Sequence, residues 1–230
     1  MLPKIDVPIY EMTIPSSGKT IRARPFTVKE EKMLLMAVES GVQSEIITTV
    51  RQVINNCMLD GDIDVDKMPF FDVDYLFTFL RGKSVGETIE VKLTCNNVVE
   101  DGICGNQFVA DMDIGKVELI KDENISNDIK LGPQAGVKMR YPNYSIMRKV
   151  EELPEIDKKT FIIASSIDYV YDKDGMHSHK DYTTDELKEF VEGLTEENYK
   201  KLEEFVDNFP SFSVKVDTKC EKCKFEHQIM

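Results

Sequence analysis

TIEVKLTCNNVVEDGICGNQFVADMDI, at residues 88–114, has the same arrangement of residue types as SVKVDTKCEKCKFEHQIM, at residues 213–230. In each stretch, two runs of alternating apolar and polar residues flank a pair of cysteines. Such alternation with a period of two is typical of the strands of a β-hairpin. The sequence therefore predicts two distant β-hairpins, each with two thiols at its turn.

Four cysteines at these two turns can form one metal site: Cys95, Cys104, Cys220 and Cys223. A closed tetrahedral set of four thiolates suits Zn²⁺ better than other common ions. We interpret the two hairpins as a zinc ribbon that closes the long intervening segment into a loop. Because four thiolates leave no open coordination position, the Zn²⁺ is expected to be structural and not catalytic.

The two cysteine pairs differ in spacing. Cys220 and Cys223 are separated by two residues, a spacing that recurs in structural zinc sites. Cys95 and Cys104 are separated by eight residues, which indicates an insertion within residues 96–103, although Gly105 suits the exit of a tight turn. This leaves two candidates for the fourth ligand, Cys104 and His227.

Three other interpretations of the cysteines are weighed against zinc. Four reduced thiols without a metal remain an alternative. A disulfide is less favoured because the sequence shows no secretory signal, and cytosolic thiols stay reduced. Thioredoxin-like redox chemistry requires a C-x-x-C that opens a helix, whereas this one closes a hairpin.

Composition limits the classes of partner. The chain has 230 residues, a net charge of −13 and 41% hydrophobic residues, which is typical of a globular protein. No apolar run is long enough to span a membrane. The negative charge argues against binding to a nucleic-acid backbone, which needs clustered lysine and arginine. We therefore predict neither a membrane nor a nucleic-acid partner. Cys57, the fifth cysteine, is expected to be a buried apolar residue within a helix.

The region 1–82 is predicted to hold a β-hairpin followed by three helices. The hairpin covers residues 10–25, and Thr27 with Glu30 has the form of a capping box at the start of the first helix. Apolar residues at helical spacing continue the pattern. The three helices are expected at residues 27–40, 44–58 and 72–82.

The ribbon, predicted at residues 83–115 and 212–230, brackets an inserted lobe at residues 116–211. Residues 151–207 contain 17 acidic and 7 basic residues, so this lobe carries most of the negative charge. Its surface is either a solvated face or a docking surface for a basic partner. Its strands are expected at 117–120, 128–131 and 137–141, and its four helices at 143–152, 157–171, 184–194 and 196–208. The predicted fold class is thus α+β.

No pattern predicts catalysis. The aspartate-rich loop at 60–66 lacks the terminal Glu of a calcium loop, and the loop containing Asp172, His177 and His179 lacks a ligand at the first position. Both loops are expected to be surface segments. Phosphate-cradling glycine loops, nucleophile elbows and H-E-x-x-H motifs are absent from the sequence. We predict that the protein is not an enzyme.

Several segments resemble the baseplate protein family of T-even-type bacteriophages. They include Ala164–Tyr169 and the terminal cysteine hairpin, and the resemblance extends over nearly the whole chain. The remaining segments lie in the first 90 residues: Arg24–Glu30, Met36–Ser40, Ile63–Pro69, Asp74–Phe77 and Leu80–Glu87. The first cysteine turn is longer than the short turn of the family. Whether Cys104 takes the ligand position that the resemblance implies therefore depends on how this longer turn folds.

The resemblance implies a role in the baseplate hub of a contractile tail, as a component or as a factor that assembles it. Its expected partners are other hub proteins, and the tape-measure protein is a further candidate. The expected location is the cytoplasm of the infected bacterial host during assembly, with the virion tail baseplate as the second candidate. The alternative from a different class is a zinc-ribbon protein that binds nucleic acid or assists transcription, which the ribbon lysines favour (Lys215, Lys219, Lys222 and Lys224).

Overall fold

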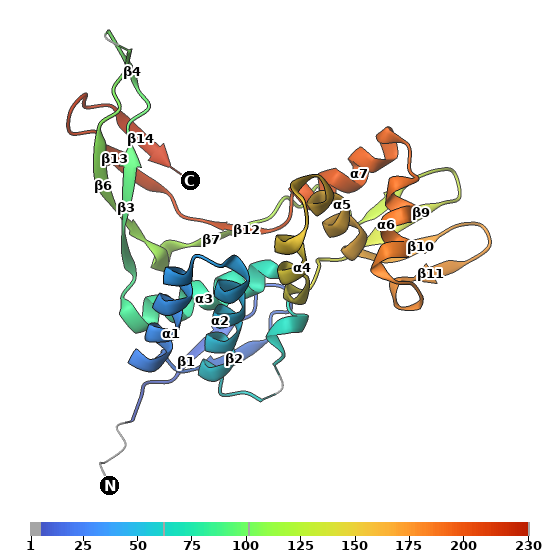
Figure 1. Ribbon diagram of the computed structural model, residues 1–230, viewed down its shortest axis with the longest axis horizontal. Helices are drawn as coiled ribbons and strands as arrows, with labels where there is room; N and C mark the ends of the chain where they lie inside the picture. Colours follow the sequence, from blue (N-terminus) through green and yellow to red (C-terminus); the bar gives the residue numbers. More distant parts are fainter. Residues whose placement is uncertain (1–5, 62, 101, 230) are drawn as a thin grey trace.

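The computed structural model describes residues 6–61, 63–100 and 102–229. Figure 1 shows three parts: an N-terminal body, a pair of long hairpins that rises from it at the upper left, and a lobe at the right. We call these parts the body, the ribbon and the lobe. Mixed helices and strands confirm the predicted α+β class, with seven α-helices in the described part of the chain.

The body consists of one β-hairpin and three helices. β1 (Tyr10–Thr13) and β2 (Thr20–Ala23) pair antiparallel, as predicted. Together with α1, α2 and α3 they enclose the largest apolar cluster. The helices are α1 (Val28–Ser40), α2 (Gln43–Cys57) and α3 (Phe70–Val85), with a short 3₁₀ turn at Val65–Lys67 before α3. Cys57 is fully buried in this cluster, which confirms its apolar role, and burial raises the pKa of its thiol to about 11.

The predicted capping box at α1 is present. The Thr27 backbone N–H donates to Glu30 Oε2 at 2.6 Å, and Arg24 forms an ion pair with the same carboxylate at 2.8 Å. The hydrogen bond from Arg24 is the main reason why the pKa of Glu30 falls to about 2. This buried contact joins the end of the hairpin to the start of α1.

The third helix is longer than predicted. It continues through Gly82 to Val85, so the expected boundary at residue 82 lies inside a helix. A β-carbon at Gly82 would make ordinary contacts with the Glu87 side chain at 3.4 Å and with Ile114 at 3.5 Å, and the glycine lies within the helix and does not end it. At its other end, Asp72 is buried and accepts the Ser16 backbone N–H at 2.9 Å, which holds the β1–β2 turn against α3.

The ribbon is formed by two antiparallel hairpins. β3 (Thr88–Thr94) pairs with β6 (Gln107–Asp113), and β13 (Val216–Lys219) pairs with β14 (Glu226–Ile229). Strands β7 (Glu118–Ile120) and β12 (Ser211–Ser213) pair with each other and lead from the ribbon toward the lobe. On the body side, the rings of Phe212 and Tyr75 pack with centroids 5.3 Å apart.

The lobe combines an antiparallel sheet, in the order β11-β10-β9-β8, with helices. It has its own apolar cluster, which includes Val137, Ile163 and Leu202. The strands are β8 (Asp128–Lys130), β9 (Gly136–Met139), β10 (Ile167–Tyr171) and β11 (Met176–Ser178). The helices are α4 (Met147–Glu152), α5 (Glu155–Ser165), α6 (Thr184–Glu192) and α7 (Glu196–Asp207).

One predicted helix of this lobe is wrong in its second half. The helix expected at 157–171 ends at Ser165, and Ile167–Tyr171 is strand β10, paired with β9 and β11. The segment Ile-Asp-Tyr-Val-Tyr is rich in β-branched and aromatic residues, which favour strands. A short apolar run does not distinguish a buried strand from a helix by periodicity alone. The lobe therefore keeps its four predicted helices, the second of them shorter than expected, and its sheet includes strand β10; α4 also packs against α2 of the body.

Candidate metal centre

The two hairpins bring the four predicted cysteines together. Their Sγ atoms all lie within 4.8 Å of one another, with Cys95 and Cys223 at 3.5 Å and Cys104 and Cys220 at 3.9 Å. Cys95, Cys104 and Cys220 are buried, whereas Cys223 is half-buried. Each close pair joins one sulfur from the β3–β6 hairpin to one from the β13–β14 hairpin. The cluster therefore sits at the contact between hairpins that are far apart in the sequence.

Both cysteine turns have the same backbone hydrogen bonds. The Cys220 N–H donates to the Phe225 carbonyl at 2.9 Å, and the Lys224 N–H donates back to the Cys220 carbonyl at 2.9 Å. In the first hairpin, Cys95 is bonded in the same way to Asn106, at 2.8 Å, and to Gly105, at 3.0 Å. The two turns are thus equivalent around Cys95 and Cys220.

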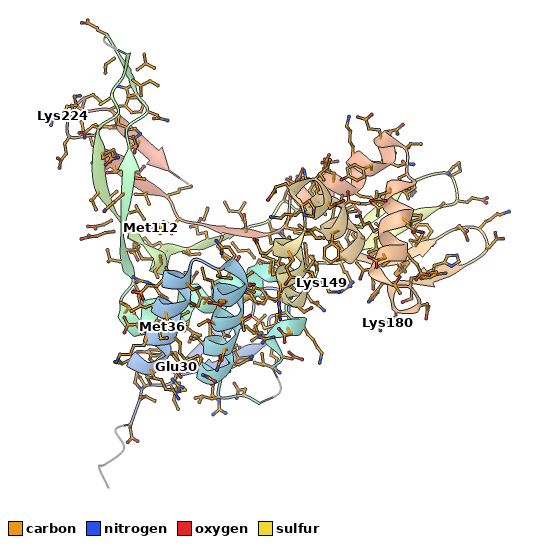
Figure 2. All side chains as sticks on the ribbon, viewed as in Figure 1. Glu30, Met36, Met112, Lys149, Lys180 and Lys224 are labelled. Carbon is orange, nitrogen blue, oxygen red and sulfur yellow. The ribbon has the colours of Figure 1, made fainter. Side chains whose placement is uncertain are left out.

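The residues after the second cysteines also match. Gly105 and Lys224 both have φ of 61°, the left-handed conformation that favours glycine. Lys224, labelled at the β13–β14 turn in Figure 2, is the non-glycine residue with positive φ in the described part of the chain. Cys104 therefore occupies the position that corresponds to Cys223, despite the longer spacing.

The extra residues of the first turn form a separate small hairpin. β4 (Val98–Val99) pairs with β5 (Gly102–Ile103), and the Cys104 N–H donates to the Asn97 carbonyl at 2.8 Å at its base. The expected insertion is thus confirmed and confined to residues beyond Asn97. It projects from the far end of the ribbon in Figure 1, with Val98 76% and Ile103 71% exposed.

N–H groups surround the sulfur atoms. The backbone N–H groups of Cys223 and Lys222 donate to Cys220 Sγ and lower the pKa of that thiol to about 6. The Phe225 backbone N–H lowers the pKa of Cys223 in the same way. Burial has the opposite effect on Cys95 and raises its pKa to about 12. Backbone donors at a turn thus stabilise thiolate in the β13–β14 hairpin.

Two asparagine amides make further contacts across the cluster. Asn97 Nδ2 lies 3.6 Å from Cys223 Sγ, and Asn106 Nδ2 lies 3.6 Å from Cys220 Sγ. Both asparagines belong to the first hairpin and both sulfurs to the second. Outer-shell donors of this kind orient ligands and offset thiolate charge. The sequence analysis missed them, although each lies within two residues of a candidate ligand, Cys95 or Cys104.

His227 also reaches the cluster. Its Nε2 lies 3.3 Å from Cys95 Sγ, and its ring packs against Phe225 and Phe108 with centroids 4.9 and 5.6 Å away. It approaches Cys95 on β3 while Cys104 keeps its own place in the cluster. Of the two candidates for the fourth ligand, Cys104 is thus among the mutually close sulfurs, and His227 lies beside them.

The four sulfurs are compatible with a metal ion. Zn–S bonds of about 2.3 Å imply tetrahedral S···S separations of about 3.8 Å, near the 3.5 and 3.9 Å of the two close pairs. These separations are far longer than a disulfide bond of about 2.05 Å. Four buried or half-buried thiols with N–H donors can hold a metal.

Comparison with known protein families identifies the chain. The family model described as "T4 bacteriophage base plate protein" matches residues 7–230. The chain belongs to this family. The match confirms the resemblance noted in the sequence and supports a role in the phage baseplate, with other baseplate proteins as partners and the virion tail as a location. Searches of curated proteins and of solved structures found no match.

In this baseplate protein, the aspartate-rich loop serves local ion pairs. Asp60 contacts Arg22 at 2.9 Å, and Asp66 contacts Arg51 at 3.1 Å. Asp64 caps the 3₁₀ turn at Val65–Lys67. The predicted surface role is confirmed for these three aspartates; Asp62 lies outside the described residues.

The two loop histidines also have local partners. His177 Nδ1 lies 3.1 Å from the Tyr182 hydroxyl, and His179 Nδ1 lies 2.8 Å from the Asp168 carbonyl. Among the described residues, the four cysteines are the one group of three or more His, Cys, Asp or Glu side chains that could hold a metal. No helix in the described ranges combines the length and apolar content needed to cross a membrane.

Carboxylates on the lobe are partly neutralised by lysines. Glu196 pairs with Lys200 and Glu197 with Lys201, each at 2.9 Å along α7. Lys159 of α5 bridges to Glu203 at 2.9 Å and to Asp207 at 3.1 Å. Because of these exposed pairs, the surface of the lobe carries both positive and negative side chains, although its net charge is negative.

Proposed function

We propose that the protein acts without catalysis as a hub component or hub-assembly factor of a contractile-tail baseplate. The observation that carries this proposal is the family match over residues 7–230. Four apolar clusters in the described part of the chain, spread over the body, the ribbon and the lobe, suit a part that contacts several neighbours. The exposed apolar tip at Val98 and Ile103 is a further feature expected of a contact protein.

We also propose that the cysteine cluster binds one structural Zn²⁺ through Cys95, Cys104, Cys220 and Cys223. The matched backbone turns, the N–H donors and the sulfur separations support this assignment. His227 is then a neighbour of Cys95 and not a ligand. Cys104→Ala should release Zn²⁺, whereas His227→Ala should retain it. Retention in Cys104→Ala together with loss in His227→Ala would reverse the two roles.

The lobe is proposed as a docking surface for a basic hub protein, met during assembly in the host cytoplasm. Its net charge should steer association, and raising the salt concentration should slow binding. The test is binding to individual hub proteins and to the tape-measure protein across a salt series. Four glutamates of α7 are changed to glutamine in parallel: Glu196, Glu197, Glu203 and Glu204. Salt-insensitive binding that survives these changes would exclude the lobe as the docking surface.

The hub proposal itself is tested by capture from infected cells. Tagged full-length protein should recover other baseplate proteins, and those proteins should remain after nuclease treatment. Recovery of an RNA polymerase or of nucleic acid in their place would favour the alternative of a zinc-ribbon transcription accessory protein. The variant in which the four α7 glutamates are changed to glutamine is the matched control, because it separates capture that depends on the charge of the lobe from capture that does not.

A further inference from the structure

Helix α1 exposes large apolar residues on the side that faces away from the body. Glu30 and Ala37 are buried on its inner side, and Leu34 packs against the core. On the outer side, four large apolar residues are more than half exposed: Val28 at 66%, Leu35 at 57%, Met36 at 70% and Val38 at 62%. Apolar side chains gathered in this way on one short helix mark an interaction site.

These residues spread over nearly half the circumference of α1, with Met36 and Val38 at the two margins of the outer face. Val28 and Leu35 are seven residues apart and Leu35 and Val38 three apart, so they occupy one side of the helix. Lys32 and Glu39, also seven apart and exposed, lie between Leu35 and Met36 around the helix, at the centre of this outer face. Neither forms an ion pair with another residue that the structure describes. On α7, in contrast, exposed glutamates are paired with lysines four residues away.

The geometry points to a second copy of this chain as the occupant of the α1 outer face. If two α1 helices pack antiparallel about a twofold axis that passes between Leu35 and Met36, Lys32 lies opposite Glu39 of the second copy. The same symmetry places Glu39 opposite Lys32 of the second copy, and Leu35 opposite its Met36. Two ion pairs and a shared apolar strip then form from one self-complementary surface.

Charge order is the reason for choosing a second copy over another protein. An antiparallel partner must present an acidic residue where α1 has Lys32 and a basic residue where α1 has Glu39. The chain itself supplies this reversed order around an apolar centre. Complementary flanking charges set partner choice and orientation between packed helices. The inference does not depend on the hub assignment, because it uses only the surface of α1.

The experiment is sedimentation velocity of the full-length protein over a concentration series, with charge-reversed variants. The wild-type protein should show a monomer–dimer equilibrium. Lys32→Glu and Glu39→Lys should each weaken dimerisation about tenfold, because each replaces two attractive pairs with two repulsive pairs. The double variant, which restores opposite charges, should recover wild-type dimerisation. An equimolar mixture of the two single variants should form mixed dimers more readily than either variant alone.

Lys130→Glu is the matched control, since it makes the same charge change at an exposed residue of β8 in the lobe, away from α1; it should leave dimerisation within about twofold of wild type. Leu35→Ser should abolish the dimer without lowering the melting temperature, because Leu35 is exposed. A wild-type protein that is monomeric up to ~0.1 mM would overturn the proposal and leave this face to a different protein. A dimer indifferent to both single charge reversals would also overturn it.

Discussion

Fourteen buried residues form the apolar cluster of the body; they come from β1, β2, α2, α3 and the adjoining segments, and include Tyr144 of the 3₁₀ turn at Tyr144–Ile146. The cluster around the ribbon's cysteines has four buried residues in the described part of the chain, and three of them are cysteines. The body can therefore be stabilised by burial of apolar side chains alone. The tip of the ribbon buries little besides sulfur, so its stability is expected to depend on a bound metal.

The largest expected effect separates the two regions directly. Cys220→Ser should release Zn²⁺ and separate the two hairpins, because metal binding of this type contributes on the order of 10 kcal/mol to folding of a small site. The body, held by its own core, should remain folded. Hydrogen exchange measured by mass spectrometry should show lost protection at residues 88–114 and 213–229 and retained protection in α2. Equal loss of protection in α2 would show that the body is not stabilised independently of the ribbon.

A core substitution in the body should give the opposite pattern. Leu76 is fully buried, and Leu76→Ala should lower the free energy of unfolding of the body by about 2–5 kcal/mol. Zinc content and ribbon protection should be unchanged. Leu202→Ala in the lobe is the matched control, because Leu202 is equally buried in a different cluster. Zinc loss in Leu76→Ala would show that the ribbon depends on the body.

Acid should weaken the body through Glu30. Its pKa is about 2 in the folded protein against an ordinary 4.5, so its carboxylate stabilises the fold above about pH 4.5. That contribution is lost as the pH falls from 4.5 toward 2. Glu30→Gln should therefore lower the melting temperature at pH 7, and its difference from wild type should shrink in acid. Glu31→Gln, in the same helical turn, is the control; a constant difference at all pH values would contradict the assignment.

The smallest effect concerns the two cysteine turns. Lys224 has a left-handed backbone conformation that costs a non-glycine residue about 1 kcal/mol. Lys224→Gly should therefore stabilise the ribbon by up to about 1 kcal/mol, and Gly105→Ala should destabilise it by a similar amount. Zinc competition with a chelator would measure both changes. The same sign for both variants would show that the turns are not equivalent.

Local signals predicted much of the fold. The capping residues Thr27 and Glu30 marked the start of α1 correctly, because this cap depends on residues only three positions apart. Strand alternation predicted both cysteine hairpins. Ile167–Tyr171 was predicted wrongly because its pairing with β9 and β11 depends on residues distant in the sequence.

At the candidate site, too, the sequence predicted local features but not contacts between residues that are distant in the sequence. The cysteines could be found from spacing and alternation. The contacts from Asn97 and Asn106 to the sulfurs could not, because each amide reaches a cysteine more than a hundred residues away. The apolar outer face of α1 is likewise visible only once the opposite face is known to be buried.

The central claim is that a metal joins the two halves of the ribbon. Metal analysis of the purified full-length protein, combined with hydrogen exchange before and after chelation, tests it most directly. We expect about one zinc per chain and loss of protection on chelation that is confined to the two hairpins. A metal-free protein whose hairpins are already protected, and whose melting temperature is unchanged by chelator, would contradict the account.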